Sequence, residues 1–233
     1  MEQYALIPEE EFFARKRFLP QRLAAFGFEP VEKGFCYRAE LLGGDFTAEL
    51  LLTPDGKLTG KVVDNMNGEE YAQLRNESLR GAYVQSVRAA YAELLTKVAD
   101  ACCADVFFCS DQANRLAARI GELFGVRPDF PFDEEPHRKS GVFRHPDNRK
   151  WFALVMNIRW KSLLKNGDET RVDVVNLKAD PAEIPELIKR AGVYPAYHMT
   201  HKNWITVTLD DRLSDGDILT LIENSYDLTK SKK

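Results

Sequence analysis

A run of positive charge in the second half of the chain is the feature with the clearest chemistry. Between Arg138 and Lys165 there are eight cationic side chains and one acidic one, Asp147, which gives +7 over 28 residues in a chain of net charge −4. Trp151 and Trp160 are interleaved with these cations. Cations contact nucleic-acid phosphates and exposed aromatic rings stack on bases, so the pattern indicates a nucleic-acid-binding surface. The candidate contacts are Arg138, Lys139, Arg144, Arg149, Lys150, Trp151, Lys161 and Lys165.

A structural interpretation of the same segment stays open. Its apolar residues alternate as on a buried strand, which predicts Phe152, Leu154, Met156 and Ile158 on one face and Trp151, Ala153 and Val155 on the other. The cations would then form a solvated rim that docks an acidic partner. Residues 1–113 carry 12 basic and 18 acidic side chains, a net of −6, so the first part of the chain could itself be that partner. A protein-interaction or adaptor module is therefore the alternative function.

Catalytic and metal-binding patterns are weak. The sequence has no Gly-x-Ser-x-Gly elbow and no glycine-rich phosphate loop, which favours a non-enzymatic protein. His198 and His201 have a metal-like spacing but no obvious third ligand, and the cysteines near residue 102 lack a fourth. We expect no metal and no cofactor. An enzyme would need a pocket, for which the candidate lining is Tyr194, Tyr197, His198 and Trp204.

Composition places the chain among ordinary soluble proteins. Of 233 residues, 44% are hydrophobic and 29% charged, and no apolar run approaches the length of a membrane span. The sequence starts with Met1-Glu2-Gln3-Tyr4, unlike a secretory signal, and its four cysteines lack a disulfide spacing. We expect a cytoplasmic protein that does not associate with membranes.

The elements around these residues predict an α+β fold of two domains, 1–109 and 110–233. All four cysteines lie in the first and all histidines and tryptophans in the second. In the first domain, helical patterns cover 9–17, 20–26 and 81–101, and strand patterns cover 35–42, 46–53 and 58–63. Gly43-Gly44 and Pro54-Asp55-Gly56 are typical of hairpin turns. The first domain is therefore predicted to be an α-β-β-β-α sandwich with an antiparallel meander.

The second domain is predicted to have the order α-β3-α-β2-α. A helix capped by Ser110 or Asp111 should end at Gly125. Strands are expected at 141–145 and 149–158 around a Pro146-Asp147-Asn148 turn, and at 172–177, 193–197 and 204–209. Helices are expected at 181–191, with Pro181 at the first position, and at 215–228. This order makes a two-layer domain.

Four motifs in the second domain carry a family resemblance. They are the hairpin Val142–Ala153, the strand Val174–Lys178, the segment Gly192–Met199 and the strand Trp204–Val207. In this order they resemble the YjbR/MmcQ family. The resemblance implies a DNA-binding function and a fold similar to double-wing modules, with the β-hairpin as a basic wing. It also implies a likeness to secretion-chaperone-like folds. Because the sequence shows no base-reading helix, we expect low sequence specificity.

The first domain is similar to the extra N-terminal domain of longer members of that family. The similarity rests on Gly60–Asp64, Gly68–Tyr71 and the stretch around Val87-Arg88. It implies no function for this domain.

Overall fold

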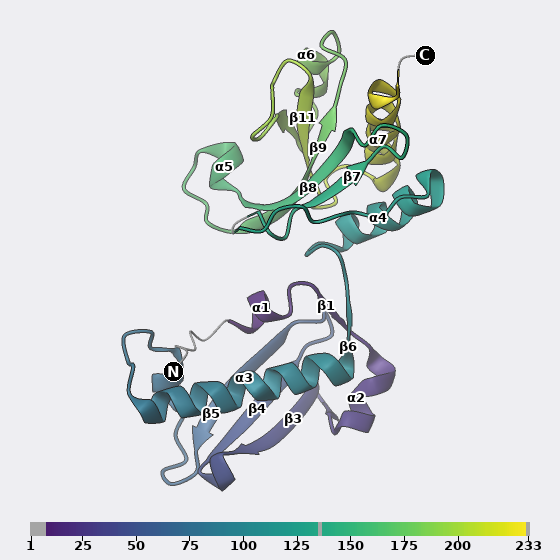
Figure 1. Ribbon diagram of the computed structural model, residues 1–233. Coiled ribbons are helices and arrows are strands. Elements are labelled where there is room, and N and C mark those ends of the chain that lie inside the picture. The colour runs from purple at the N-terminus through teal and green to yellow at the C-terminus, as the bar shows by residue number, and fades with distance from the viewer. Residues whose placement is uncertain (1–7, 135–136, 232–233) are drawn as a thin grey trace. The chain divides into compact units, whose positions relative to one another are not determined.

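The computed structural model describes residues 8–134 and 137–231, which pack as two units (Figure 1). The first unit extends to Val106 and the second starts at Phe107, close to the boundary expected after residue 109. Both units combine helices with antiparallel sheets, which confirms the predicted α+β class.

The first unit holds a four-stranded sheet of order β2-β3-β4-β5 and a small pair, β1-β6. Its elements are α1 (Glu9–Phe12), β1 (Lys16–Phe18), α2 (Pro20–Phe26), β2 (Glu29–Val31), β3 (Gly34–Leu41), η1 (Leu42–Gly44), β4 (Phe46–Leu52), β5 (Leu58–Asp64), η2 (Ala72–Arg75), α3 (Ala82–Cys102) and β6 (Cys103–Asp105).

Two details of the first unit differ from the sequence prediction. The helix expected over 9–17 ends at Phe12, because Lys16–Phe18 pairs as a strand with Cys103–Asp105. The expected three-stranded meander gains a fourth strand, β2, which lies at the sheet edge. Pro30 fits there, since a proline removes a backbone donor and is tolerated on edge strands.

The sheet of the first unit is covered by a helix on one face. Alternate residues of β4, from Phe46 to Leu52, are buried in one cluster with the apolar residues of α3, as the period of two dictates. The other face carries a row of charge, in which Glu49 pairs with Arg38 at 2.9 Å and with Lys61 at 2.7 Å. This face is half-buried or exposed along its length.

The second unit holds a five-stranded antiparallel sheet of order β10-β11-β9-β8-β7. Its helices α4 and α7 lie on one face and the short α5 lies on the other (Figure 1). Its elements are α4 (Asp111–Phe124), β7 (Gly141–Arg144), β8 (Trp151–Arg159), α5 (Lys161–Leu164), β9 (Arg171–Lys178), α6 (Ile184–Leu187), β10 (Val193–Pro195), β11 (Trp204–Thr208) and α7 (Asp215–Thr229).

The ends of two helices in the second unit differ in how well they match the predicted caps. Ser110 caps α4 by accepting a hydrogen bond from the Ala113 N–H at 3.1 Å, and Gly125 ends it in the left-handed conformation, as predicted. The helix expected over 181–191 is only one turn long, Ile184–Leu187. Asp180 accepts a hydrogen bond from the Ala182 N–H at 2.8 Å, and the resulting turn competes with a helix start there.

A β-bulge changes the faces of β8. Phe143 lies opposite Ala153, but the next residue, Arg144, lies opposite Trp151. Phe152 is therefore the extra residue and joins the core under α4 and α7, whereas Trp151 packs on the other face beside Leu154. The strict alternation predicted for this strand was wrong for these two residues.

Candidate functional site

The loop at the tip of the β7–β8 hairpin is anchored to the end of α7. The Asn148 side-chain amide donates to the Thr229 carbonyl at 2.8 Å and to the Ser231 hydroxyl at 3.2 Å. His145 is buried, and its ring stacks on Tyr226 with 4.2 Å between centroids. Arg149 adopts a left-handed backbone conformation, with φ of 60°. The tip is thus held in a defined position from which its cations project.

Two cations of the hairpin share one carboxylate. Asp129, in the loop after α4, accepts from Arg144 Nε at 2.7 Å and from Arg149 Nη2 at 3.4 Å, both at Oδ2. Its other oxygen, Oδ1, is buried and has no hydrogen-bond partner among the described residues. The Arg144 side chain is 21% exposed and that of Arg149 is 69% exposed, so Arg149 is the freer of the two.

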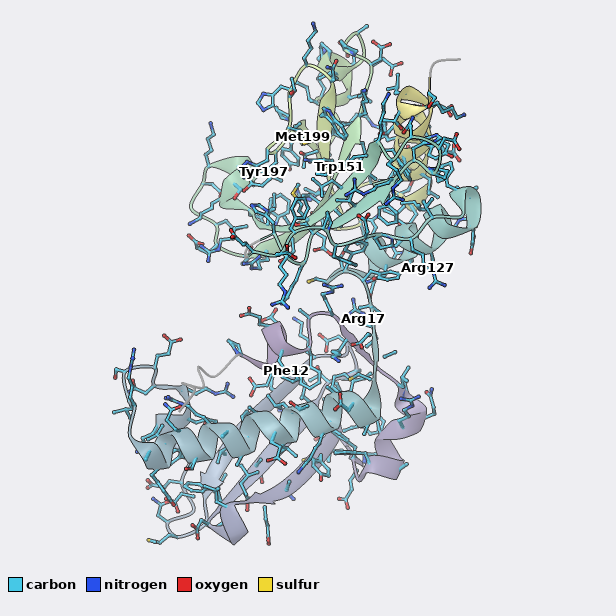
Figure 2. The ribbon with its side chains drawn as sticks, viewed as in Figure 1. Phe12, Arg17, Arg127, Trp151, Tyr197 and Met199 are labelled. Atoms are coloured by element: carbon cyan, nitrogen blue, oxygen red, sulfur yellow. The ribbon has the colours of Figure 1, made fainter. Side chains whose placement is uncertain are left out.

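A pocket of about 270 Å³ opens beside this pair. Its lining adds Arg127, an exposed residue that makes no ion pair with the rest of the described chain. Figure 2 labels Arg127 in the segment that follows α4. The full lining is Gly125, Val126, Arg127, Asp129, Arg144 and Arg149. Three guanidinium groups and one carboxylate leave a net charge of +2, which suits an anion.

The predicted aromatic contact, Trp151, is engaged within the fold. Its ring lies 6.0 Å from that of Phe132, edge-on, and the Arg144 guanidinium lies 5.4 Å above it. Figure 2 shows Trp151 and Tyr197 in one region of the unit, where both pack against the same apolar cluster. Trp151 is half-buried, so it supports Arg144 instead of offering an open stacking surface.

The eight cations of the predicted surface form separate groups. Lys150 is exposed at the hairpin tip, where it follows the pocket residue Arg149 in the chain. Lys161 and Arg159 both pair with Glu169, the latter at 2.9 Å. The strand β8 separates these groups by roughly 25–30 Å, at about 3.3 Å per residue. The remaining candidates, Arg138, Lys139 and Lys165, are exposed in loops away from the tip.

The four residues predicted to line an enzymatic pocket do not share one set of neighbours. The Tyr194 hydroxyl accepts from Arg212 Nη1 at 3.4 Å, and its ring lies 6.5 Å from that of Trp160. Tyr197 contacts His198, with 4.1 Å between ring centroids, and Trp204 is half-buried opposite Lys178.

Metal and thiol chemistry find little support in the described part of the chain. No cluster of three or more histidine, cysteine, aspartate or glutamate side chains is placed to hold a metal ion within residues 8–134 and 137–231. Cys102 and Cys103 lie at the end of α3 and are buried. Burial raises the pKa of the Cys103 thiol to about 12, which disfavours the thiolate needed for metal binding or nucleophilic attack.

A second, wider hollow lies on the open face of the first sheet. It measures about 520 Å³ and is bordered by Cys36, Leu51 and Thr59, which face one another across three strands, and by the charged row of Glu49 and Lys61. The charged side chains that line the hollow are two acids, Glu32 and Glu49, and two lysines, Lys33 and Lys61, so the hollow has no excess of one sign. The pocket beside the hairpin is therefore the stronger candidate site.

Comparison with known proteins identifies the second unit. The YjbR family model matches residues 121–228, from α4 to α7. The uncharacterised protein YyaQ of Bacillus subtilis (strain 168) is 35% identical over 111 residues, which make up 48% of this chain and 92% of YyaQ. The chain belongs to the YjbR family. The YjbR domain thus includes the hairpin and every residue that lines the charged pocket.

Solved structures are similar to the same half of the chain. A crystal structure of a Pseudomonas syringae protein is 40% identical and covers 50% of this chain and 97% of its own, with a TM-score of 0.47. A Deinococcus radiodurans protein with a DUF419 domain is 27% identical and covers 52% of this chain and 79% of its own, with a TM-score of 0.39.

Among the described residues, no helix combines the length and the apolar character that crossing a membrane requires.

Proposed function

We propose that the YjbR domain binds nucleic acid through its phosphate backbone, without catalysis, at the pocket beside the β7–β8 hairpin. The observation that carries the proposal is the convergence of Arg127, Arg144 and Arg149 on one pocket, with the exposed Lys150 following Arg149 in the chain. Counting Asp129, these side chains have a net charge of +3, and guanidinium groups bind phosphate oxygens in a fork geometry.

The anchored tip supports this function in a specific way. Asn148 and His145 fix the hairpin to α7, so the cations are held in place before a ligand arrives. Side chains that are ordered beforehand lose less conformational entropy on binding. The hairpin would then lie against the backbone as a rigid edge.

Low sequence specificity follows from the same geometry. Phosphate contacts position a protein on a duplex but do not distinguish bases. The two long helices of the domain, α4 and α7, each have aspartates in the first turn, Asp111 in one and Asp215 and Asp217 in the other. These carboxylates would repel phosphates from the helix N-termini, so neither helix end is suited to enter a groove.

Fluorescence anisotropy of labelled duplex and single-stranded oligonucleotides tests the proposal. We expect Arg149→Glu with Lys150→Glu to lower affinity at least tenfold and equally for unrelated sequences, because two phosphate contacts become repulsive. The matched control is Lys189→Glu with Lys202→Glu, which makes the same charge change at exposed positions that precede β10 and β11, on the side of the sheet opposite β7, and should leave affinity within about twofold.

Equal loss in both double variants would show a general charge effect and contradict the proposal. If neither the duplex nor the single-stranded oligonucleotide binds at low salt, the alternative is favoured. In that alternative the same arginines bind the carboxylates of an acidic protein.

A further inference from the structure

The charge and size of the hairpin pocket narrow down which phosphate it suits. The pocket holds three guanidinium groups and one carboxylate, so a single dianion neutralises it. A phosphate inside a nucleic-acid strand is a diester with one negative charge, whereas a terminal phosphate carries about 1.5 to 2 at neutral pH. Only the terminal group matches the charge of the pocket.

The volume of the pocket leads to the same ligand. About 270 Å³ lies just below the roughly 300–1,000 Å³ of pockets that bury drug-sized ligands, so the pocket has room for a phosphate group and a small part of the molecule that carries it. An internal phosphate has a sugar on both sides and meets the pocket only at its rim. A terminal phosphate has a free side and can present three oxygens to the arginines of the pocket.

Asp129 occupies this site in the absence of a ligand. Both hairpin arginines bind its Oδ2, while Oδ1 has no donor in the described chain. Both hydrogen bonds, at 2.7 and 3.4 Å, therefore go to the same carboxylate oxygen, and neither guanidinium group makes the two parallel hydrogen bonds to Asp129 that its geometry allows. A phosphate with three free oxygens offers each guanidinium a better acceptor than the carboxylate does.

We propose that Arg127, Arg144 and Arg149 form a binding site for a terminal phosphate group, with Asp129 as an internal anion that keeps two of the arginines in place until the phosphate arrives. The inference rests on the proposed function, since it assigns the preferred part of the nucleic acid: its phosphorylated end. The same group is also available on free mononucleotides and as inorganic phosphate.

The test compares one duplex with 5′-phosphate and with 5′-hydroxyl ends, using the full chain and anisotropy at constant ionic strength. We expect the phosphorylated duplex to bind at least about fivefold more tightly. Arg127→Ala should abolish this difference, since Arg127 is exposed and unpaired in the described structure and its loss leaves the fold intact. Lys165→Ala removes one exposed cation outside the pocket and should leave the difference unchanged.

Each result has one meaning. Equal binding of the two duplexes, or equal loss in Arg127→Ala and Lys165→Ala, would overturn the terminal-phosphate site while leaving backbone binding in place. Titration with inorganic phosphate, followed by NMR of the arginine side chains, separates the sources of the group. Saturable phosphate binding without duplex binding would support the site and contradict the nucleic-acid function. Absence of both would overturn both.

Discussion

The two sheets of this protein differ in whether their second face is covered. In the first unit α3 covers one face, and the other carries a row of ion pairs in which Arg38 and Lys61 share the carboxylate of Glu49. In the YjbR domain both faces of the sheet are buried, one under α4 and α7 and the other under α5 and loop side chains. A sheet that is covered on both sides has no free face for a ligand, so the candidate binding residues lie at the hairpin and in the loop beside it. The first unit leaves a whole sheet face available, but its charges already satisfy each other.

The largest effect should come from matched leucines on the two sheets. Leu154 is buried on the second face of the YjbR sheet, and Leu51 is half-buried on the open face of the first sheet. Leu154→Ala should lower the free energy of unfolding by about 2–5 kcal/mol, because it removes packing and leaves a cavity. Leu51→Ala should cost less than about 1 kcal/mol. Urea denaturation measures both, and equal losses would show that the open face is packed as tightly as a core.

The next largest difference between the two units should be the salt dependence of their affinity for duplex DNA. The hairpin site has a net charge of +3, so about three phosphate contacts predict a slope of log affinity against log salt near −2.7. Raising salt from about 50 to about 200 mM should weaken duplex binding roughly 40-fold. Fragments 1–106 and 107–233 should each fold, and only the second should show this slope in anisotropy titrations. A similar slope for the first fragment would place the binding charges elsewhere.

Lowering the pH should reduce the stability of the first unit more than that of the second. Glu9 is buried; burial raises its pKa, but hydrogen bonds from Arg75 and Tyr91 outweigh this and leave the pKa below its ordinary 4.5. A lowered pKa stabilises the fold above about pH 4.5, and the contribution disappears as the pH falls through the lowered value.

Glu9→Gln should therefore cost about 1–2 kcal/mol at pH 7 and progressively less below pH 4.5. Chemical denaturation at several pH values, followed by a probe in the first unit, measures the difference. A cost that is independent of pH would show that the carboxylate contributes no charge interaction.

The smallest effect concerns the internal anion of the pocket. Asp129→Asn removes the carboxylate that competes for Arg144 and Arg149, so binding of a 5′-phosphorylated duplex should strengthen by about two- to fivefold. Glu223→Gln removes an exposed carboxylate on α7 and serves as the control. Weaker binding by the Asp129 variant would mean that the carboxylate's main role is to position the arginines.

Local patterns predicted most of the elements and named two of the three pocket arginines, Arg144 and Arg149, but not the pocket that they share with Arg127. The alternation of β4, the apolar spacing of α3 and the cap at Ser110 are properties of neighbouring residues, and each was predicted correctly. The strand β1 was missed because it forms only by pairing with Cys103–Asp105, far along the chain. The exchange of Trp151 and Phe152 between faces comes from a bulge that has no sequence signal of its own.

The charge of the site could not be read from one window of sequence. Between Arg138 and Lys165 only Asp147 opposes the cations, yet the acids that pair with them are Asp129 and Glu169, which lie just outside that window. Arg127 was missed for the same reason, because the fold brings its loop to the hairpin. A count of charge along the chain therefore overstated the free positive charge and missed Arg127, the third arginine of the pocket.

The stacked rings beneath the pocket have a spectroscopic consequence. Tyr226 lies between Phe124, at 4.1 Å, and His145, at 4.2 Å between centroids. Phe124 precedes the Gly125–Arg127 wall of the pocket, and His145 follows Arg144 on the other wall. The ring current of Tyr226 should shift the imidazole protons of His145 upfield, and any movement of one wall against the other should alter that shift. The protein thus contains an unlabelled NMR reporter of the opening and filling of its own pocket.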